Sequence, residues 1–135
     1  MNYIDAFKKE EGLIARLGES NAYLIWTMGL YLDESELDTL ATNCLTDEGG
    51  DKKIDFLQTD MENRKIIFVQ GTYSPKPKDG AKANKASDMN TAMAWFLNGN
   101  LAGFPEHLQK NVEEARKAID DDKIDEIEII YLHNN

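Results

Sequence analysis

The sequence contains a single cysteine, Cys44, so no disulfide can form within the chain. A lone thiol is typical of a protein in a reducing compartment, and its simplest role is that of a small buried hydrophobic residue. Long apolar runs are also missing, because the longest, residues 22–32, is too short to span a bilayer. Residues 1–12 do not form a basic leader followed by an apolar stretch. We therefore expect a soluble cytoplasmic protein without membrane contact.

Positive charge is scarce as well. The chain has 15 Lys and Arg residues against 25 Asp and Glu residues, which gives a formal net charge of −10. Affinity for nucleic acid depends on clustered Lys and Arg that release counterions from phosphates. This composition therefore excludes binding of nucleic acid across the whole surface, and any such contact has to be local.

The length of 135 residues suits one domain with a hydrophobic core of its own. The sequence contains no internal repeat and no low-complexity segment. We expect residues 1–135 to form a single domain, either as a natural short protein or as the N-terminal part of a longer one. In the second case, further domains or protein partners would complete the function.

Hydrophobic periodicity predicts the secondary structure. Helices are expected over five segments, namely 3–17, 22–32, 33–43, 88–97 and 105–119. Strands are expected over three segments, namely 54–59, 65–70 and 124–132. The order of these elements predicts an α/β or α+β domain, in which helices flank a small mixed sheet.

The first two strands carry polar residues where burial is expected. A hairpin with a four-residue loop over 61–64 places Asp55 opposite Gln70. Because side chains alternate along a strand, Asp55, Gln70 and Thr72 then share one end of an otherwise apolar face. A buried carboxylate needs a partner or a cation, so this end of the hairpin is either exposed to solvent or a site.

The same residues carry a resemblance to a known family. Residues 21–72 resemble the N-terminal domain of AIPR (abortive infection phage resistance) proteins, and the likeness is strongest over 45–74, LTDEGGDKKIDFLQTDMENRKIIFVQGTYS. These proteins carry a D-G-x-x-D-x-x-I-D loop and strand followed by I-x-x-x-Q-x-K-Y. Their domain is similar to the restriction-endonuclease-like, PD-(D/E)XK nuclease fold. The resemblance implies such a core with an extra N-terminal helix, in a phage-defence protein that cleaves DNA with Mg²⁺ or Mn²⁺.

Carried over position by position, the resemblance implies a metal site and one departure from the family pattern. Asp55 matches the metal-binding aspartate, Gln70 matches the Glu or Gln position, and Gly71 would offer its carbonyl to the metal. Tyr73 matches the aromatic residue that follows. Thr72 stands where the family has the lysine that assists the attacking water. Since a hydroxyl carries no positive charge, we expect catalysis that is weak or lost.

A positively charged segment follows the candidate site directly. Residues 71–90 hold four lysines, Lys76, Lys78, Lys82 and Lys85, against two aspartates. These lysines are candidates for binding the DNA backbone and for replacing the missing lysine. The alternative is a solvated loop, because Lys interspersed with Pro, Gly and Ala is ordinary linker composition.

Other carboxylates have weaker claims. Asp47, Glu48 and Asp51 precede the first strand and either supplement the metal site or are simply solvated. Glu19 stands at the entrance to the second helix, where nuclease folds of this type sometimes add an acidic residue. The electrostatics of a helix start explains Glu19 equally well.

Two functions from different classes follow from the sequence. The first is Mg²⁺-dependent phosphodiester hydrolysis of DNA, with Asp55 and Gln70 as metal ligands and a loop lysine in place of the missing one. The alternative is a catalytically inactive nuclease fold that serves as an interaction or sensor module. The substitution at Thr72 and the acidic charge of the chain favour this alternative.

Overall fold

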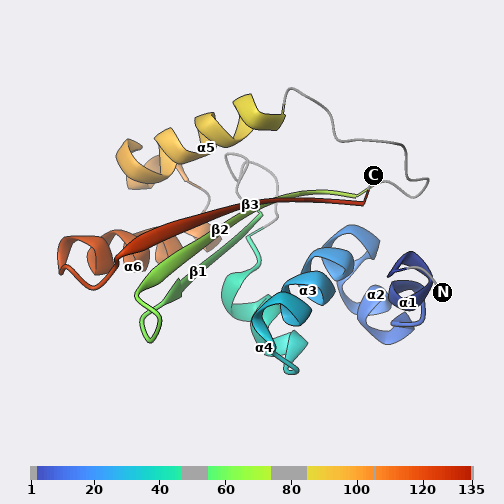
Figure 1. Ribbon diagram of the computed structural model, residues 1–135. Coiled ribbons are helices and arrows are strands. Elements are labelled where there is room, and N and C mark those ends of the chain that lie inside the picture. Colours follow the sequence, from blue (N-terminus) through green and yellow to red (C-terminus); the bar gives the residue numbers. More distant parts are fainter. Residues whose placement is uncertain (1–2, 47–54, 74–84, 105, 135) are drawn as a thin grey trace. The chain divides into compact units, whose positions relative to one another are not determined.

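The computed structural model describes residues 3–46, 55–73, 85–104 and 106–134. Its elements are, in chain order, α1 (Tyr3–Lys8), α2 (Glu11–Leu17), α3 (Glu19–Leu32), α4 (Leu37–Cys44), β1 (Phe56–Asp60), β2 (Lys65–Thr72), α5 (Lys85–Asn98), a 3₁₀ helix (Leu101–Gly103), α6 (Glu106–Asp120) and β3 (Glu126–His133) (Figure 1). Helices flank a three-stranded sheet, which confirms the predicted class of fold.

The sheet has the strand order β1-β2-β3. Strands β1 and β2 pair in antiparallel fashion from Phe56 opposite Val69 to Asp60 opposite Lys65, which confirms the predicted register and four-residue loop. Strand β3 begins beside the start of β2, because the N–H of Asp125 donates to the carbonyl of Arg64 at 2.7 Å. The two strands therefore run in the same direction, and the sheet is mixed.

The chain divides into two compact units. The first comprises Met1–Leu45, Gly71–Ala81 and Leu132–Asn135, and the second comprises Thr46–Gln70 and Lys82–Tyr131. The last residues of β2 and β3 thus belong to the first unit, while the rest of the sheet belongs to the second.

The core of the second unit lies between one face of the sheet and the helices α5 and α6 (Figure 1). The buried side chains of this core are Leu57, Ile66, Phe68, Ala92, Phe96, Phe104, Leu108, Val112 and Ala115. The rings of Phe68 in β2 and Phe96 in α5 meet edge to face with centroids 5.8 Å apart, a preferred geometry for aromatic pairs. Helix α6 lays its apolar stripe on β1, while its charged face points to solvent.

The core of the first unit is built on an aromatic cluster. Phe7 of α1 contacts Tyr23 and Trp26 of α3, with ring centroids 5.2 Å and 5.5 Å apart. Tyr73, the residue after β2, lies 5.1 Å from Tyr23 by the same measure. Leu13 of α2 packs against this cluster and completes it.

The prediction of one continuous helix over residues 3–17 is wrong. This segment forms α1 and α2, with a break at Lys9 and Glu10. Phe7 and Leu13 are six positions apart and would point in different directions from one continuous helix. Both are buried in the same aromatic cluster, and the break allows this. At the break the N–H of Glu10 bonds to the carbonyl of Phe7 at 2.8 Å, a tighter turn than that of an α-helix.

Two other boundaries also move. Asp33 takes a left-handed conformation with φ 56° and ends α3, so the next helix begins at Leu37 rather than at residue 33. Helix α5 begins at Lys85, three residues before the predicted start at residue 88. Helix α2 ends at Leu17, where the predicted helix over 3–17 also ends, and Gly18 follows it with φ 83°.

Candidate functional site

The β1–β2 hairpin holds the two residues that the sequence singles out. Its loop is closed by Asp60, whose carboxylate accepts hydrogen bonds from the backbone and side-chain N–H groups of Asn63 at 3.1 Å and 2.8 Å. Arg64 completes the loop in a left-handed conformation with φ 55°. These contacts set the register along both strands, and the register decides which side chains share a face.

Gln70 lies near the end of β2 and is almost completely buried, with 2 % of its surface exposed. By the alternation of side chains it continues the face of Ile66 and Phe68, which forms the core of the second unit. Its Oε1 atom is buried and has no hydrogen-bond partner in the described part of the chain. An unsatisfied buried oxygen destabilises a fold by about 1–3 kcal/mol, so such a group calls for an explanation, such as an ordered water or a bound ion.

Asp55 lies one residue before β1 and is half-buried. Its N–H donates to the carbonyl of Val69 at 3.1 Å, and its own carbonyl accepts from the N–H of Thr46 at 2.9 Å. The paired segment ends at Phe56 and Val69, so the predicted pairing of Asp55 with Gln70 falls one position beyond it. These hydrogen bonds hold the backbone of Asp55 beside Val69, the residue that precedes Gln70.

The residues after Gln70 belong to the first unit. Gly71 and Thr72 end β2, and both are half-buried. The hydroxyl of Tyr73 donates a hydrogen bond to the carboxylate of Glu19 at the start of α3, with a distance of 2.5 Å. Burial raises the pKa of Tyr73 well above its usual value, and the hydrogen bond to Glu19 raises it further. Glu19 therefore serves as an acceptor for Tyr73.

Several predicted residues lie outside the described part of the chain. These are Lys76, Lys78, Lys82, Asp47, Glu48 and Asp51. Lys85 is the first residue of α5, but its side chain falls outside the described set as well. The role of the lysine-bearing segment in binding DNA stays a prediction.

The donor set can be tested against a divalent cation. Mg²⁺ and Mn²⁺ prefer hard oxygen ligands, and the buried, unpartnered Oε1 of Gln70 is such an oxygen. The carboxylate of Asp55, on the neighbouring strand segment, would add one negative charge to such a site. Within residues 3–46, 55–73, 85–104 and 106–134, no three Asp, Glu, His or Cys side chains gather closely enough to hold a metal ion. The residues that the structure describes therefore offer a cation one buried amide oxygen and no cluster of carboxylates.

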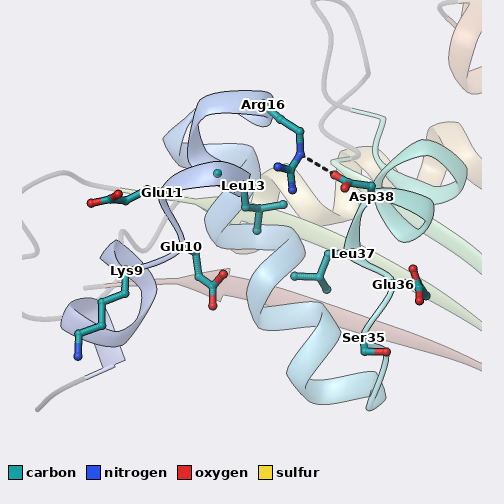
Figure 2. A pocket seen from close by; sticks show the side chains of 10 residues that line it. Lys9, Glu10, Glu11, Leu13, Arg16, Ser35, Glu36, Leu37 and Asp38 are labelled. Carbon is teal, nitrogen blue, oxygen red and sulfur yellow. Dashed lines mark hydrogen bonds and ion pairs between the residues drawn. The ribbon is translucent and has the colours of Figure 1, made fainter.

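A second candidate is a groove in the first unit, which the sequence reasoning missed. Its walls are the α1–α2 turn with the start of α2, and residues 35–38 at the start of α4 (Figure 2). The hollow between them has a volume of about 510 Å³. Arg16 of α2 and Asp38 of α4 form an ion pair at 3.0 Å across it. The runs KKEEG and DESE, residues 8–12 and 33–36, were the available signal, because acidic residues crowd two short connections.

No family model, curated protein or solved structure matches the chain. The resemblance to the AIPR domain and to the restriction-endonuclease-like core therefore stays a prediction. Among the helices that the structure describes, none has the length and apolar character needed to cross a membrane.

Proposed function

We propose that the β1–β2 hairpin carries the cation site of a nuclease-like domain, in which Asp55 and Gln70 bind Mg²⁺ or Mn²⁺. The observation that carries this proposal is the buried Oε1 of Gln70, which has no hydrogen-bond partner among the described residues. A cation at this end of the hairpin would satisfy that oxygen. Asp55 would provide the negative charge that a divalent cation requires, and the carbonyl of Gly71 a third ligand.

The order of elements supports the same proposal. An antiparallel strand pair is followed by two helices and by β3, which lies beside β2 and runs in the same direction. In the proposed nuclease-like domain, α5, α6 and β3 would take the place of the helix-to-strand half of a restriction-endonuclease-like core. The phage-defence setting rests on the resemblance to AIPR proteins alone.

Each candidate residue has a separate role in the proposed hydrolysis of DNA. When bound, the cation polarises a phosphate oxygen and lowers the pKa of a bound water. Asp55 and Gln70 hold it at the end of the hairpin, and the lysines of segment 71–90 bind the DNA backbone. Thr72 can donate a hydrogen bond to the phosphate but supplies no positive charge. Loss of one preorganised donor typically lowers the rate by about two to three orders of magnitude, so we expect slow phosphodiester hydrolysis.

Binding and cleavage are tested separately. Binding of Mn²⁺ is measured by calorimetry, and nicking of supercoiled plasmid is measured with Mg²⁺ or Mn²⁺. Asp55→Asn is expected to weaken Mn²⁺ binding at least about tenfold, because it removes the one charged ligand. Glu113→Gln on the exposed face of α6 is the matched control and should bind as the wild type does. Binding that Asp55→Asn leaves unchanged would contradict the cation site, and plasmid nicking that survives this substitution would contradict its role in catalysis.

Thr72 decides between a slow enzyme and a silent module. Thr72→Lys restores the charge that the family pattern has at this position, and it is expected to raise the rate of nicking by about 100-fold. The second candidate function is an inactive nuclease-like fold that binds other proteins, and the threonine itself favours it. If Mn²⁺ binds through Asp55 but neither the wild type nor Thr72→Lys cleaves DNA, the inactive module is the correct assignment.

A further inference from the structure

The groove in the first unit continues into a second hollow. The first hollow, of about 510 Å³, and the second, of about 410 Å³, share the lining residues Glu10, Ser35 and Leu37. All lining residues of both hollows belong to the first unit, so the groove is formed within one compact body. We call this pair of hollows the helical groove.

The lining of the helical groove is partly apolar. Leu13 and Leu37 project from opposite walls of the first hollow (Figure 2), and Trp26, Gly29 and Leu30 line the second. Leu30 is 67 % exposed, which is high for a large aliphatic side chain. A ligand with an apolar group would remove this surface from water, which is favourable.

The rim of the helical groove is strongly acidic. Six lining residues are carboxylates, namely Glu10, Glu11, Asp33, Glu34, Glu36 and Asp38, and two are cations, Lys9 and Arg16. Arg16 is bonded to Asp38, and Lys9 points away from the groove in Figure 2. No cation in the described part of the chain pairs with Glu10, Asp33 or Glu36. The negative charge at the rim is therefore largely uncompensated.

These features select the chemistry of the occupant. The carboxylates line the rim rather than converge, since no three of them among the described residues lie closely enough to hold a metal ion. Nucleic acid and a second copy of this chain, with its net charge of −10, would both be repelled by the rim. We propose that the helical groove binds a short basic peptide segment of a partner protein. The segment places an apolar side chain between Leu13, Leu30 and Leu37, and its Lys or Arg residues meet Glu10 and Glu36.

The test uses a fluorescein-labelled peptide of alternating Lys and Leu pairs, and anisotropy measured with the full chain. The double variant Glu10→Lys/Glu36→Lys is expected to weaken binding at least about tenfold, because it reverses the charge of the rim. The double variant Glu113→Lys/Glu114→Lys on α6 makes the same change of net charge on another exposed surface. Equal loss of affinity in the two double variants would overturn the proposal, because it would mean that only net charge matters.

Apolar contact is tested by a second pair of variants. Leu30→Ser is expected to weaken binding of the Lys-Leu peptide about three- to tenfold, whereas Met61→Ser, at an exposed residue of the hairpin loop, should leave it unchanged. A peptide in which Ser replaces every Leu should bind more weakly than the original. If the Ser peptide binds as tightly, the groove is only a charged surface and the proposal is wrong.

The position of the bound peptide is read from backbone amide shifts in NMR spectra. Binding in the helical groove should shift the amides of Glu10, Leu13 and Leu37, and leave those of β1 unshifted. Shifts confined to β1 and β2 would contradict the proposal. Sedimentation measures whether the chain forms a dimer, which is the competing occupant of the groove. A dimer that Leu30→Ser abolishes would assign the groove to a second copy and overturn the proposal. The proposal does not depend on the cation site, because the two lie in different elements and use different residues.

Discussion

The guanidinium of Arg116 in α6 donates a hydrogen bond of 2.7 Å to the carbonyl of Gly99, the residue that follows α5. It also donates to the carbonyls of Trp95 and Phe96 at 3.1 Å and 2.8 Å, and it lies over the ring of Phe104. The side chain of Arg116 thus binds three carbonyls at the C-terminal end of α5, where the last carbonyls of a helix lack partners within the helix. The carbonyl of Trp95 also accepts a hydrogen bond from the N–H of Gly99.

Arg116→Met is therefore expected to lower the free energy of unfolding by about 2–3 kcal/mol, because hydrogen bonds from a charged group are worth more than neutral ones. The loss is measured by urea unfolding followed by circular dichroism. Lys110→Met on the exposed face of the same helix is the control and should change stability by less than about 0.5 kcal/mol. An equal, small effect of both substitutions would show that α5 ends without help from Arg116.

The second prediction concerns the buried oxygen of Gln70. Gln70→Met keeps a similar volume and removes the unpartnered Oε1, so it is expected to raise the free energy of unfolding by about 1 kcal/mol in the absence of metal. The same variant should lose Mn²⁺ binding. Stability is measured by urea unfolding in the presence of a chelator. A destabilised Gln70→Met protein would mean that the amide is satisfied in solution, and the site would lose its main support.

The third prediction follows from the pKa of Tyr73, which burial and the bond to Glu19 raise above its usual value. The folded state retains the phenolic proton at a pH where the unfolded state releases it. The contribution of the protonated Tyr73 to the free energy of unfolding is therefore fully present below about pH 10. Above that pH it falls as the pH rises towards the folded pKa. Tyr73→Phe lacks the titrating group, so its stability relative to the wild type should improve as the pH rises above about 10, the usual pKa of a tyrosine. Urea unfolding at several pH values measures this, and parallel curves would contradict it.

The fourth prediction compares two helical glycines. A Cβ at Gly12 would meet only the flexible end of Arg16, at 3.2 Å, so Gly12→Ala is expected to stabilise the protein by about 0.5 kcal/mol. A Cβ at Gly29 would clash with Cδ2 of Leu37 and would lie 3.0 Å from the backbone oxygen of Glu34. Gly29→Ala is therefore expected to destabilise the protein by about 1–3 kcal/mol despite its better helix propensity. Thermal unfolding of the two variants measures both signs, and stabilisation by Gly29→Ala would mean that α3 and α4 do not pack this closely.

Local patterns of the sequence determined much of the sheet and its helices. The alternation around Phe68 and the loop over 61–64 were sufficient to predict the register of β1 and β2, because a slip of one residue would turn every apolar side chain to the other face. The class of fold followed from the order of helices and strands. The predicted end of the first helical segment at residue 17 was also correct, and Gly18 follows it with a positive φ that suits a residue without a side chain.

Only the tertiary structure decided the break between α1 and α2. Helical spacing alone favoured one continuous helix, but Phe7 and Leu13 both pack on the cluster around Tyr23, and their burial outweighs the lost helical turn. Tertiary structure likewise decided the burial of Gln70. The sequence places the amide in a strand, but strand alternation alone does not say which face of the sheet is covered, and in the structure Gln70 is buried.

The helical groove depends on tertiary structure most of all. Its two walls come from residues 9–16 and 33–38, and the acidic character of both segments is legible in the sequence. That they face one another across Leu13 and Leu37 depends on how α2 and α4 pack against α3. Sequence determines which side chains each helix carries, while burial of the shared aromatic core decides which of them meet.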